Sequence, residues 1–455
     1  MSNPGLQDFL NDLSSNHPDE VFRVKEEVDI NGLPSALALE MQHRNRFPVI
    51  LLERLSGFDM PLVTNVFGSW DRILRLLGCS DGNYGAVWER IQKGRMKPVV
   101  VKNGPVKEVS VEKEALDVGR LPIPLHFQND AGRYIAGGFQ VALDPETGVP
   151  NLSYHRMQLK GKDKFGISLM SRGHVWDYFC RSEQNGKDLE MAVVIGAHPS
   201  ILLGAVAKVG IEVDEYEIGG ALLGEPVELV KCETIDVYVP ASAEIVIEGR
   251  VLAGEREPEG PFGEYTGYSG KGSTDTVFVV TAMTRRKEAI FLDNVGGNSA
   301  DHLSLTRVTK EMMVFHHLKE IFPELKAIHY PTSGVNFHCY LSMDIKMPGR
   351  ARQALMHLFG LDHLVKLGIV VDADIDVSNE GQVLWSLATR VQARERVFVV
   401  PDSFCNVADP SARGVLSDKV GIDATSPLDG APERLIVEPG ALEQARKFLE
   451  RRGEG

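Results

Sequence analysis

The chain has 455 residues, more than the roughly 250–300 at which a single hydrophobic core stops growing, so two or three domains are expected. Its 63 acidic and 49 basic side chains give a formal net charge of −14, which disfavours binding to nucleic acid or to an anionic membrane. These numbers favour a small molecule or another protein as the partner.

The cysteines and the apolar segments indicate in which cellular compartment the protein is expected. The five cysteines are odd in number and lack CxxC spacing, which is typical of free thiols in a reducing compartment. The N-terminal residues contain no apolar block of the kind found in signal peptides. No apolar run approaches the ~20 residues of a membrane span. We therefore expect a cytoplasmic protein without a membrane span.

Helix-like and strand-like segments alternate in the first 115 residues. Apolar residues recur with helical spacing at 6–13, 35–45, 69–78 and 86–94, and β-branched runs occupy 47–55 and 96–103. The pattern predicts an N-terminal α/β domain over residues 1–115.

Strands dominate the predicted structure of residues 116–298. Residues 137–161 contain two alternating stretches joined by Asp-Pro-Glu-Thr-Gly, which is typical of a β-hairpin. Residues 191–209 are typical of a strand, a turn and an apolar helix. Further strands are predicted at 229–240, 244–252 and 275–286. We expect a mostly antiparallel barrel with a helical insert.

The α/β pattern returns beyond residue 298. Helices are predicted at 305–322, 351–361 and, as a short amphipathic segment, 440–455, and strands at 336–347 and 365–377. The sequence therefore predicts a C-terminal α/β domain over residues 299–455.

Residues 255–270, EREPEGPFGEYTGYSG, have the most unusual composition in the chain. Repeated Gly and Pro exclude a regular helix or a central strand. Glu259 and Glu264 flank Gly-Pro-Phe-Gly, so both carboxylates can project into one shared space. A solvated acidic surface loop is the alternative, but Phe262 and Tyr265 indicate that the loop faces something partly dry.

The string EPEGPFGEYTGY resembles the glutamate-bearing loop of UbiD-type decarboxylases. Other segments resemble blocks of the same family in the same order: DPETGVPNLSYHRMQ, RGH at 172–174, AHPS at 197–200, GEPVELVKCETIDVYVPASAEIVIEG, and VVDADIDV followed by LWSLATR. The resemblance extends along nearly the whole chain. It implies a central split β-barrel, similar to that of flavin reductases, that carries prenylated FMN.

The resemblance implies that Arg156, Glu259 and Glu264 form the catalytic set. An arginine presents a planar fork of donors that can hold a carboxylate or orient a glutamate. Glu264 would protonate the carbon left after carbon dioxide departs, and Glu259 would position Arg156. A dry pocket raises the pKa of a carboxyl group and a neighbouring arginine lowers it, and the sequence leaves open which effect is larger.

The resemblance also implies that Asn151, His174 and Glu233 bind Mn²⁺ (or Mg²⁺) at the flavin phosphate, with K⁺ close by. Oxygen and imidazole ligands suit these ions. Asn151 and Arg156 are five residues apart, so a regular strand would point them to opposite faces. A bulge, a strand that begins after Asn151, or action at two ends of one cofactor would each explain this spacing, and we favour the last.

Ser153, His174 and Lys366 are expected to bind the cofactor, although Lys366 would equally suit the solvated end of a strand. Met170 and Tyr265 are expected on the substrate side or as packing residues.

His302 and Arg307 lie where a helix is predicted to begin. They would recognise a second polar group on the substrate, or belong to a capped helix with an exposed arginine.

The expected function is reversible, non-oxidative decarboxylation of an aromatic, heteroaromatic or α,β-unsaturated carboxylic acid with prenylated FMN. The family resemblance implies a homodimer or higher homo-oligomer, with contacts in the C-terminal domain, and a flavin prenyltransferase as the cofactor supplier. No GxGxxG or GxxxxGK[ST] precedes a helix, which argues against a dinucleotide fold. The alternatives are an NAD(P)H-dependent flavin reductase and a non-catalytic flavin-binding subunit of a decarboxylase complex.

Overall fold

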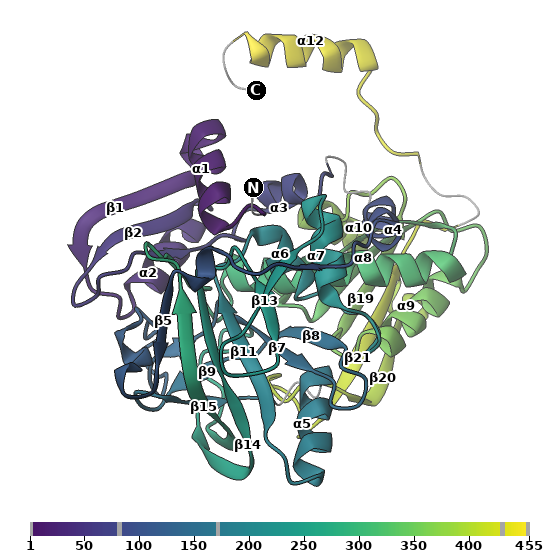
Figure 1. Cartoon of the computed structure of the whole chain (residues 1–455). Helices are drawn as coiled ribbons and strands as arrows, with labels where there is room; N and C mark the ends of the chain where they lie inside the picture. Colours follow the sequence, from purple (N-terminus) through teal and green to yellow (C-terminus); the bar gives the residue numbers. More distant parts are fainter. Residues whose placement is uncertain (1–2, 80–83, 170–172, 428–432, 452–455) are drawn as a thin grey trace.

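Four β-sheets organise the part of the chain that the structure describes. This structure is a computed structural model that describes residues 3–79, 84–169, 173–427 and 433–451 (Figure 1). A four-stranded sheet comes mainly from the N-terminal residues, a nine-stranded sheet forms the centre, a three-stranded sheet lies beside it, and a five-stranded sheet comes from the C-terminal residues. The expected multi-domain α/β architecture is confirmed.

The N-terminal sheet mixes parallel and antiparallel pairs. Its strands are, in spatial order, β1 (Val21–Val28), β2 (Val49–Leu55), β3 (Leu62–Thr64) and β16 (Phe291–Leu292). The accompanying helices are α1 (Leu6–Asn16), α2 (Leu33–His43), α3 (Trp70–Leu76) and α4 (Tyr84–Lys93). The four helices expected here are confirmed to within a few residues. Strand β1 was not predicted, because it is a largely exposed edge strand with little apolar alternation.

The central sheet is antiparallel throughout and curls on itself (Figure 1). Its strands are, in spatial order, β6 (Tyr134–Ile135), β9 (Met157–Leu159), β10 (Lys164–Ile167), β15 (Ser273–Arg285), β14 (Ile245–Glu259), β11 (Leu189–Ile195), β7 (Phe139–Leu143) and β8 (Pro150–Tyr154), and β5 (Val109–Glu112) pairs with β15. The expected hairpin is confirmed as β7 and β8, which pair from Phe139 opposite Tyr154 to Leu143 opposite Pro150.

Three helices accompany this sheet: α5 (His174–Gln184), α6 (Pro199–Gly204) and α7 (Glu215–Leu223). Only α6 was expected from the sequence. The three-stranded sheet has the order β13 (Tyr238–Pro240), β12 (Glu228–Lys231) and β4 (Val99–Val100). Strand β12 therefore pairs within this small sheet and not with β8.

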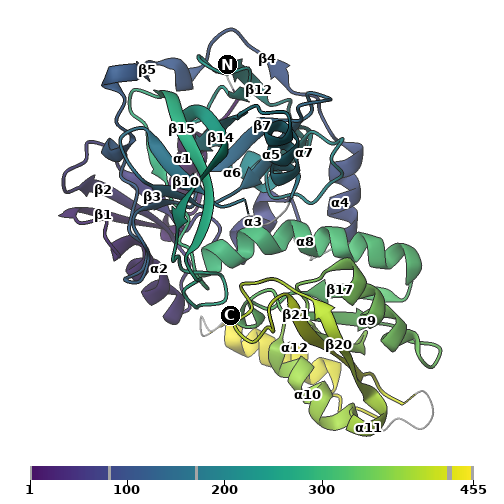
Figure 2. The same ribbon diagram turned by 90° about the horizontal axis from the view of Figure 1, so that it is seen from below.

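Helix α8 (Ala300–Ile321) runs between the central sheet and the C-terminal sheet (Figure 2). The strands of the C-terminal sheet are, in spatial order, β17 (Leu325–His329), β18 (His338–Met343), β19 (Leu367–Asp372), β21 (Leu416–Ala424) and β20 (Val397–Phe404). The other helices here are α9 (Arg350–Leu361), α10 (Glu380–Arg390), α11 (Ala393–Arg396) and α12 (Pro439–Glu450). Helix α12 stands away from the rest of the molecule (Figure 1).

Strands cross the predicted domain boundaries. Strands β4 and β5 precede residue 115 but pair with β12 and β15, and β16 precedes residue 298 but pairs with β3. The boundaries at 115 and 298 stay predictions. Among the described residues, no disulfide joins the cysteines, and no helix is long and apolar enough to cross a membrane.

Candidate active site

Neighbouring elements of the central sheet bring the three predicted catalytic residues together. Arg156 lies in the short connection between β8 and β9, Glu259 is the last residue of β14, and Glu264 follows in the loop before β15. Strands β9, β10, β15 and β14 are consecutive neighbours in the sheet. Residues that are more than a hundred positions apart in the sequence can therefore meet.

The side chain of Arg156 binds both glutamates. Its Nε donates to Glu259 Oε1 at 2.9 Å and its Nη2 donates to Glu259 Oε2 at 2.7 Å, while Nη1 donates to Glu264 Oε1. The side chains of Arg156, Glu259 and Glu264 are 15%, 1% and 24% exposed. Glu259 is therefore the buried anchor of a bidentate pair, and Glu264 is the more accessible carboxyl group.

Backbone contacts fix the loop that carries Glu264. Gly260 has φ +77°, a conformation that favours glycine, and its N–H donates to Tyr134 Oη at 3.1 Å. The N–H of Gly263 donates to Asp130 Oδ1 at 2.8 Å. The ring of Phe262 lies under the guanidinium, with Arg156 Cζ 5.2 Å from its centroid. The loop is thus held on both sides of the Gly-Pro-Phe-Gly turn.

Burial decides the direction of the Glu264 pKa. Loss of solvent raises the pKa, the charge and hydrogen bond of Arg156 lower it, and the negative charge of Glu259 raises it, with a net increase. Burial also opposes the charge of Arg156, but Glu259 and Glu264 outweigh it and raise its pKa. The cluster therefore combines a permanent cation with a carboxyl group that keeps its proton to a higher pH than usual.

A cavity of about 400 Å³ adjoins this cluster. Tyr265, next to Glu264, and His155, next to Arg156, both line it. The rest of its wall comes from β8, the first turn of α5, the residues after α6, the start of α7, and α8, together with Asn336 and Leu364 of the C-terminal part. The cavity therefore extends from the three charged residues toward the boundary with the C-terminal sheet.

Three polar residues meet on one wall of the cavity. Asn151 Nδ2 lies 2.6 Å from Glu215 Oε1 and 3.4 Å from His174 Nδ1. Asn151 Oδ1 is buried and has no hydrogen-bond partner among the residues that the structure describes, and burial raises the pKa of Glu215 to about 8. An unsatisfied amide oxygen, an imidazole and a buried carboxyl group form a donor set that fits Mn²⁺ or Mg²⁺.

The predicted metal ligand Glu233 lies elsewhere, and the structure corrects this assignment. Glu233 follows β12 of the three-stranded sheet, its side chain is 40% exposed, and Lys107 Nζ lies 2.9 Å from its Oε1. It is not among the residues that line the cavity. Glu215, at the start of α7, occupies the expected position beside Asn151 and His174.

The interval between Asn151 and Arg156 has a simple structural explanation. Strand β8 ends at Tyr154, so Arg156 lies beyond the regular strand and strand alternation does not reach it. Residues 151–155 all line the cavity, and the side chain of Asn151 contacts Glu215 and His174 there. Arg156 lies past the strand end and contacts the glutamates.

The other predicted cofactor-binding residues differ in position. Ser153 lies in the cavity wall, with its Oγ 3.1 Å from His155 Nε2. Lys366 does not line the cavity, and its Nζ lies 2.7 Å from Asp409 Oδ2 and 2.6 Å from Ser411 Oγ. Their roles in binding a cofactor stay predictions.

The structure separates the two residues proposed to recognise the substrate. His302 lines the cavity, and its Nδ1 lies 3.0 Å from Gly297 O. Arg307 is buried outside the cavity wall, where its Nη1 donates to Tyr330 O at 3.1 Å and its Cζ lies 3.8 Å from the Trp70 ring. Arg307 is therefore neither an exposed arginine nor a cavity residue. Met170 lies outside the described residues.

Sequence reasoning missed several cavity residues. Glu215 follows Asp214, which caps α7 by accepting from Tyr216 N, so the capping pattern could have revealed the helix. Lys208 and Lys310 also line the cavity. No spacing or composition pattern connects these two lysines with Arg156, because they come from separate elements that meet only in the folded chain.

Comparison with known proteins identifies the family. Models of the 3-octaprenyl-4-hydroxybenzoate carboxy-lyase (UbiD) N-terminal, Rift-related and C-terminal domains match residues 16–90, 97–299 and 304–424. These matches cover most of the chain. The chain belongs to the UbiD family of prenylated-FMN-dependent decarboxylases.

Individual relatives agree with this membership. The UbiD-class enzyme HmfF from Pelotomaculum thermopropionicum, solved with FMN, is 37% identical, with a TM-score of 0.91 over 97% of this chain and 98% of that one. Vanillic acid decarboxylase of Sedimentibacter hydroxybenzoicus is 28% identical, with a TM-score of 0.88 over 99% of both chains. Anhydromevalonate phosphate decarboxylase of Methanothermobacter thermautotrophicus is 29% identical over 94% of this chain and 98% of that protein. The chain is therefore a carboxy-lyase, which confirms the expected class of enzyme over a flavin reductase.

Proposed function

We propose that the chain removes carbon dioxide from an aromatic, heteroaromatic or α,β-unsaturated carboxylic acid at the cluster of Arg156, Glu259 and Glu264. One observation carries this proposal: a half-buried carboxyl group with a raised pKa lies against an arginine that a second, fully buried glutamate holds in place. Substrate carboxylate, arginine and proton donor can therefore occupy one space.

Each residue has a separate task in this proposal. The Arg156 guanidinium attracts the carboxylate of the substrate and orients Glu264. Glu259 keeps the guanidinium in one rotamer through its two hydrogen bonds. Glu264 delivers its proton to the carbon that has lost carbon dioxide, and burial favours this role because it keeps the carboxyl group protonated closer to neutral pH.

Prenylated FMN, when bound, supplies an electron sink for the carbon that loses its carboxylate. The cavity of about 400 Å³ beside the cluster is our candidate for the cofactor-binding site, and Ser153 and His174 lie in its wall. Asn151, His174 and Glu215 would hold Mn²⁺ or Mg²⁺ there. The K⁺ ion and the role of Lys366 are further expectations of the family resemblance.

Metal content tests the assignment of Glu215 directly. We expect Glu215→Gln to lose the bound divalent ion, because the charged oxygen ligand is replaced by an amide. The matched control Glu233→Gln breaks only the ion pair with Lys107 and should keep the metal. Elemental analysis after dialysis against a fixed Mn²⁺ concentration gives the metal per chain. Loss of metal in Glu233→Gln, or full occupancy in Glu215→Gln, would reverse the assignment.

We also propose that the chain works as a homodimer or larger homo-oligomer of a single gene product. A related structure, of an evolved form of HmfF that is 35% identical to this chain, is dimeric and contains prenylated FMN. The intact catalytic cluster in one chain supports activity without a different subunit. A flavin prenyltransferase would supply the cofactor.

A screen for carbon dioxide release tests the activity. The purified chain, loaded with prenylated FMN, should release carbon dioxide from at least one member of a panel of aromatic, heteroaromatic and acrylic acids. Loading with unmodified FMN is the control and should give no release. Oxidation of NADH or NADPH, measured in the same preparation, should not exceed that of free flavin. A preparation that oxidises nicotinamide and releases no carbon dioxide would contradict the proposal.

A further inference from the structure

One face of helix α8 lines the cavity and has no task in the chemistry proposed above. His302, Thr306 and Lys310 all line the cavity, and their spacing of four residues places them along one face of the helix. Within residues 301–310, only His302 and Thr306 are not fully buried. The helix therefore meets the cavity along this face.

A chain of hydrogen bonds connects this face with the loop that carries Glu264. His302 Nδ1 donates to Gly297 O at 3.0 Å, because a carbonyl oxygen can only accept. Gly297 N in turn donates to Gly263 O at 3.3 Å. The first turn of α8 is therefore tied to the residue before the proposed proton donor.

A second chain of contacts runs through the C-terminal part. The rings of Tyr265 and Phe337 meet edge to face, with their centroids 5.8 Å apart. The neighbouring Asn336 donates from its Nδ2 to Thr306 Oγ1 at 3.4 Å. Val335 and Asn336 have φ +42° and +66°, and this left-handed conformation is strained for a β-branched residue such as valine. Backbone strain clusters at ligand sites, which supports a ligand beside this face of α8.

Lys310 contributes a buried cation whose hydrogen-bonding capacity is not used. Its side chain is 11% exposed, and its Nζ has no hydrogen bond among the residues that the structure describes. Asp362 Oδ2 lies 3.3 Å away, but this oxygen already accepts from Tyr330 Oη at 3.0 Å. The other oxygen of Asp362 accepts from Leu364 N. An ammonium group has three donors, so Lys310 can bind a further acceptor.

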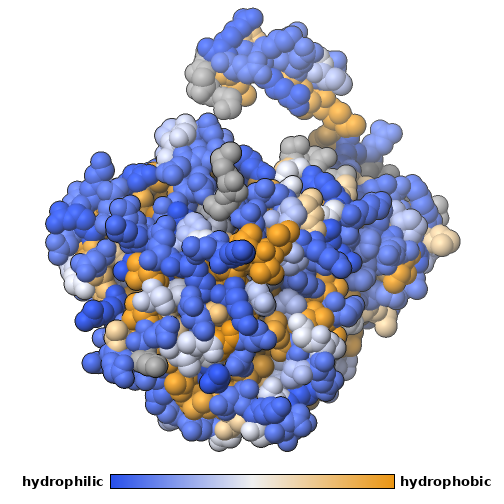
Figure 3. Space-filling view, in the orientation of Figure 1, coloured by the Kyte–Doolittle hydropathy of each residue, from blue (hydrophilic) through white to orange (hydrophobic). Residues whose placement is uncertain are grey.

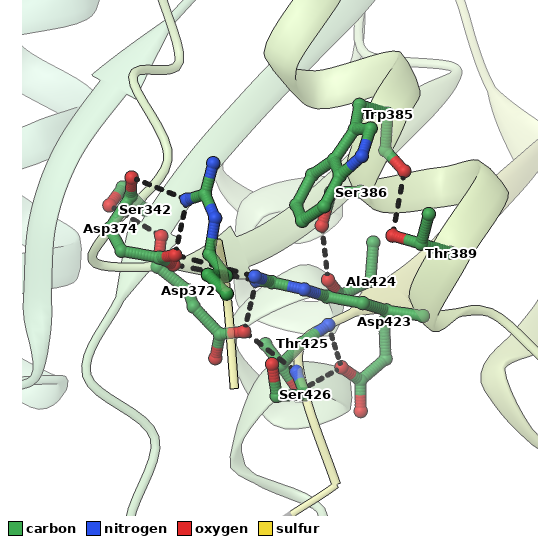
Figure 4. A network of polar contacts seen from close by, with 12 residues as sticks. Ser342, Asp372, Asp374, Trp385, Ser386, Thr389, Asp423, Ala424, Thr425 and Ser426 are labelled. Carbon is green, nitrogen blue, oxygen red and sulfur yellow. Dashed lines mark hydrogen bonds and ion pairs between the residues drawn. The ribbon is translucent and has the colours of Figure 1, made fainter. Parts of the chain in front are cut away.

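Comparison with other charged groups shows what Lys310 lacks. Hydrophilic side chains cover most of the face in Figure 3, where water solvates them. Arg390 is almost as buried as Lys310 but has two acidic partners, Asp372 and Asp374, which Figure 4 shows together at the end of β19. Burial of a charge is unfavourable without such partners, so the position of Lys310 favours an anionic ligand.

Lys208 adds a second cation to the same cavity. It follows α6, lines the cavity and makes no ion pair with any described residue. Solvent reaches its side chain, yet the surrounding protein displaces enough water to lower its pKa, and the charge of Lys310 lowers this pKa further. The two ammonium groups are therefore close enough to repel each other, and an anion between them would relieve this repulsion.

Charge balance indicates which molecule supplies the anion. Among the described residues, Asp362 is the one carboxylate within ion-pair distance of Lys208 or Lys310, which leaves one positive charge uncompensated. The metal and the cofactor phosphate have their own proposed ligands on β8, α5 and α7. Lys310 comes from a different wall, which the contacts above connect with the loop of Glu264. A group on the substrate therefore suits this part of the cavity.

We propose that Lys310 and Lys208 bind a second anionic group of the substrate, a carboxylate or a phosphate, so that the substrate is an acid with at least two negative charges. This proposal rests on the decarboxylation proposed above and names the class of acid. Arg156 holds the carboxylate that leaves, and the two lysines hold the anion that remains, so both ends orient the substrate.

Binding of non-reacting acids to the chain loaded with unmodified FMN tests the proposal without turnover. The probes with two anionic groups are benzene-1,3-dicarboxylate, benzene-1,4-dicarboxylate and 4-phosphonobenzoate, and benzoate is the probe with one. We expect at least one of the three to bind ~10-fold or more tightly than benzoate in isothermal titration calorimetry. Equal affinity for all four acids would overturn the proposal, while release of carbon dioxide from an acid with one charge would still support the proposed function.

Variants of the two lysines locate the preference. Lys310→Met should reduce it to less than ~3-fold, and Lys310→Arg should restore most of it. Lys208→Met is the second variant, because it breaks no ion pair of the described residues and tests the same anion if Lys310→Met fails to fold. The control Lys346→Met changes an exposed lysine that pairs with Asp344 and should keep the full preference.

The affinity for FMN distinguishes the substrate from the cofactor as the source of the anion. Lys310→Met and Lys208→Met should bind FMN within ~3-fold of the wild type, as measured by the quenching of flavin fluorescence. An unchanged preference for two charges in the lysine variants would overturn the proposal. If those variants also lost affinity for FMN, the lysines would be assigned to the cofactor phosphate instead.

Discussion

At the scale of single residues, the central feature is an arginine shared unequally between two glutamates. Glu259 receives two hydrogen bonds and is almost fully buried, whereas Glu264 receives one and remains partly exposed. This asymmetry assigns the glutamates different tasks. The first maintains geometry, and the second can exchange a proton with a bound molecule.

The pKa of Glu264 should respond to its neighbour. In Glu259→Gln, the pKa of Glu264 should fall, because a negative charge disappears and Arg156 is free to pair fully with the remaining carboxylate. Infrared titration of the carboxyl band of Glu264, identified by its loss in Glu264→Gln, measures this shift. An increase in the pKa of Glu264 would show that the interaction with Glu259 has been assigned the wrong sign.

The pH dependence of activity follows from the same group. Glu264 donates its proton only when protonated, so kcat/KM should decrease as pH rises through its raised pKa. In Glu259→Gln this decrease should begin at a lower pH. The measurement is kcat/KM of the reconstituted wild type and of Glu259→Gln between pH 5 and 9. A decrease that begins at a higher pH in Glu259→Gln than in the wild type would contradict the role of Glu264 as the proton donor.

Arginine should not be replaceable by lysine at position 156. Lysine keeps the charge but cannot make the two parallel hydrogen bonds to Glu259 and a third to Glu264. We expect Arg156→Lys to lower kcat/KM by roughly 10² or more, in line with the loss of a positioned catalytic group. Far-ultraviolet circular dichroism should be unchanged, and an activity within about threefold of wild type would contradict this role.

At the scale of secondary-structure elements, sequence patterns predicted the fold well where an element is rich in buried apolar residues. Helix α8 and strands β18 and β19 lie within a few residues of their expected ranges, because their apolar residues face a core. Strand β14 was expected to end near residue 252 but continues to Glu259, so the start of the 255–270 segment is part of a central strand and the expectation that this segment excludes one was wrong there. The sequence did not reveal α5, α7 and β1. In α7 the first turn contains Glu215, a buried carboxyl group, so the helix lacks a simple polar face. Glu215 lies in this missed helix, whereas Glu233 was assigned from the family resemblance.

The resemblance to the UbiD family predicted a grouping of residues that local sequence patterns could not predict. The contact between Arg156 and the two glutamates depends on pairing between β9, β10, β15 and β14, and no local signal encodes the order of those strands. Motif similarity placed the three residues in one group, and their side chains are in contact, while their catalytic roles stay predictions. The position of Glu233 failed because a motif match alone does not report that β12 joins a different sheet.

The N-terminal cap of α8 supports the cavity wall. Ser299 Oγ accepts from His302 N at 3.2 Å and donates to Val295 O, and His302 lines the cavity. We expect Ser299→Ala to lower the free energy of unfolding by about 1 kcal/mol. Urea denaturation of the wild type and the variant measures the difference. Equal midpoints and slopes would show that the cap contributes nothing to stability.

At the scale of the whole molecule, α8 connects the N-terminal and C-terminal parts of the fold, with contacts to α4, β17 and α9. Arg307 on this helix contacts Trp70 of the N-terminal part and Tyr330 and Thr332 beyond β17. Its buried partner on the same helix is Glu311, with Nε and Oε1 3.7 Å apart. Arg307 was expected either to recognise the substrate or to be exposed on a capped helix, and it is instead a buried connection between parts of the fold.

Removal of this connection should destabilise the protein. We expect Arg307→Met to lower the free energy of unfolding by about 3 kcal/mol, because Glu311 loses its buried positive partner. The matched control Arg23→Met breaks an exposed pair with Glu53 and should change stability by less than about 0.5 kcal/mol. Denaturant titration measures both variants, and equal effects would contradict a special role for Arg307.

The most direct test of the account is the turnover of Glu264→Gln in enzyme loaded with prenylated FMN. Glutamine preserves the shape of the side chain but has no proton to deliver, so carbon dioxide release should fall by roughly 10²–10⁴. Glu257→Gln, which changes a glutamate two residues before Glu259 and paired with Lys164, should retain wild-type turnover. Equal turnover of Glu264→Gln and the wild type would contradict the proposed role of the cluster.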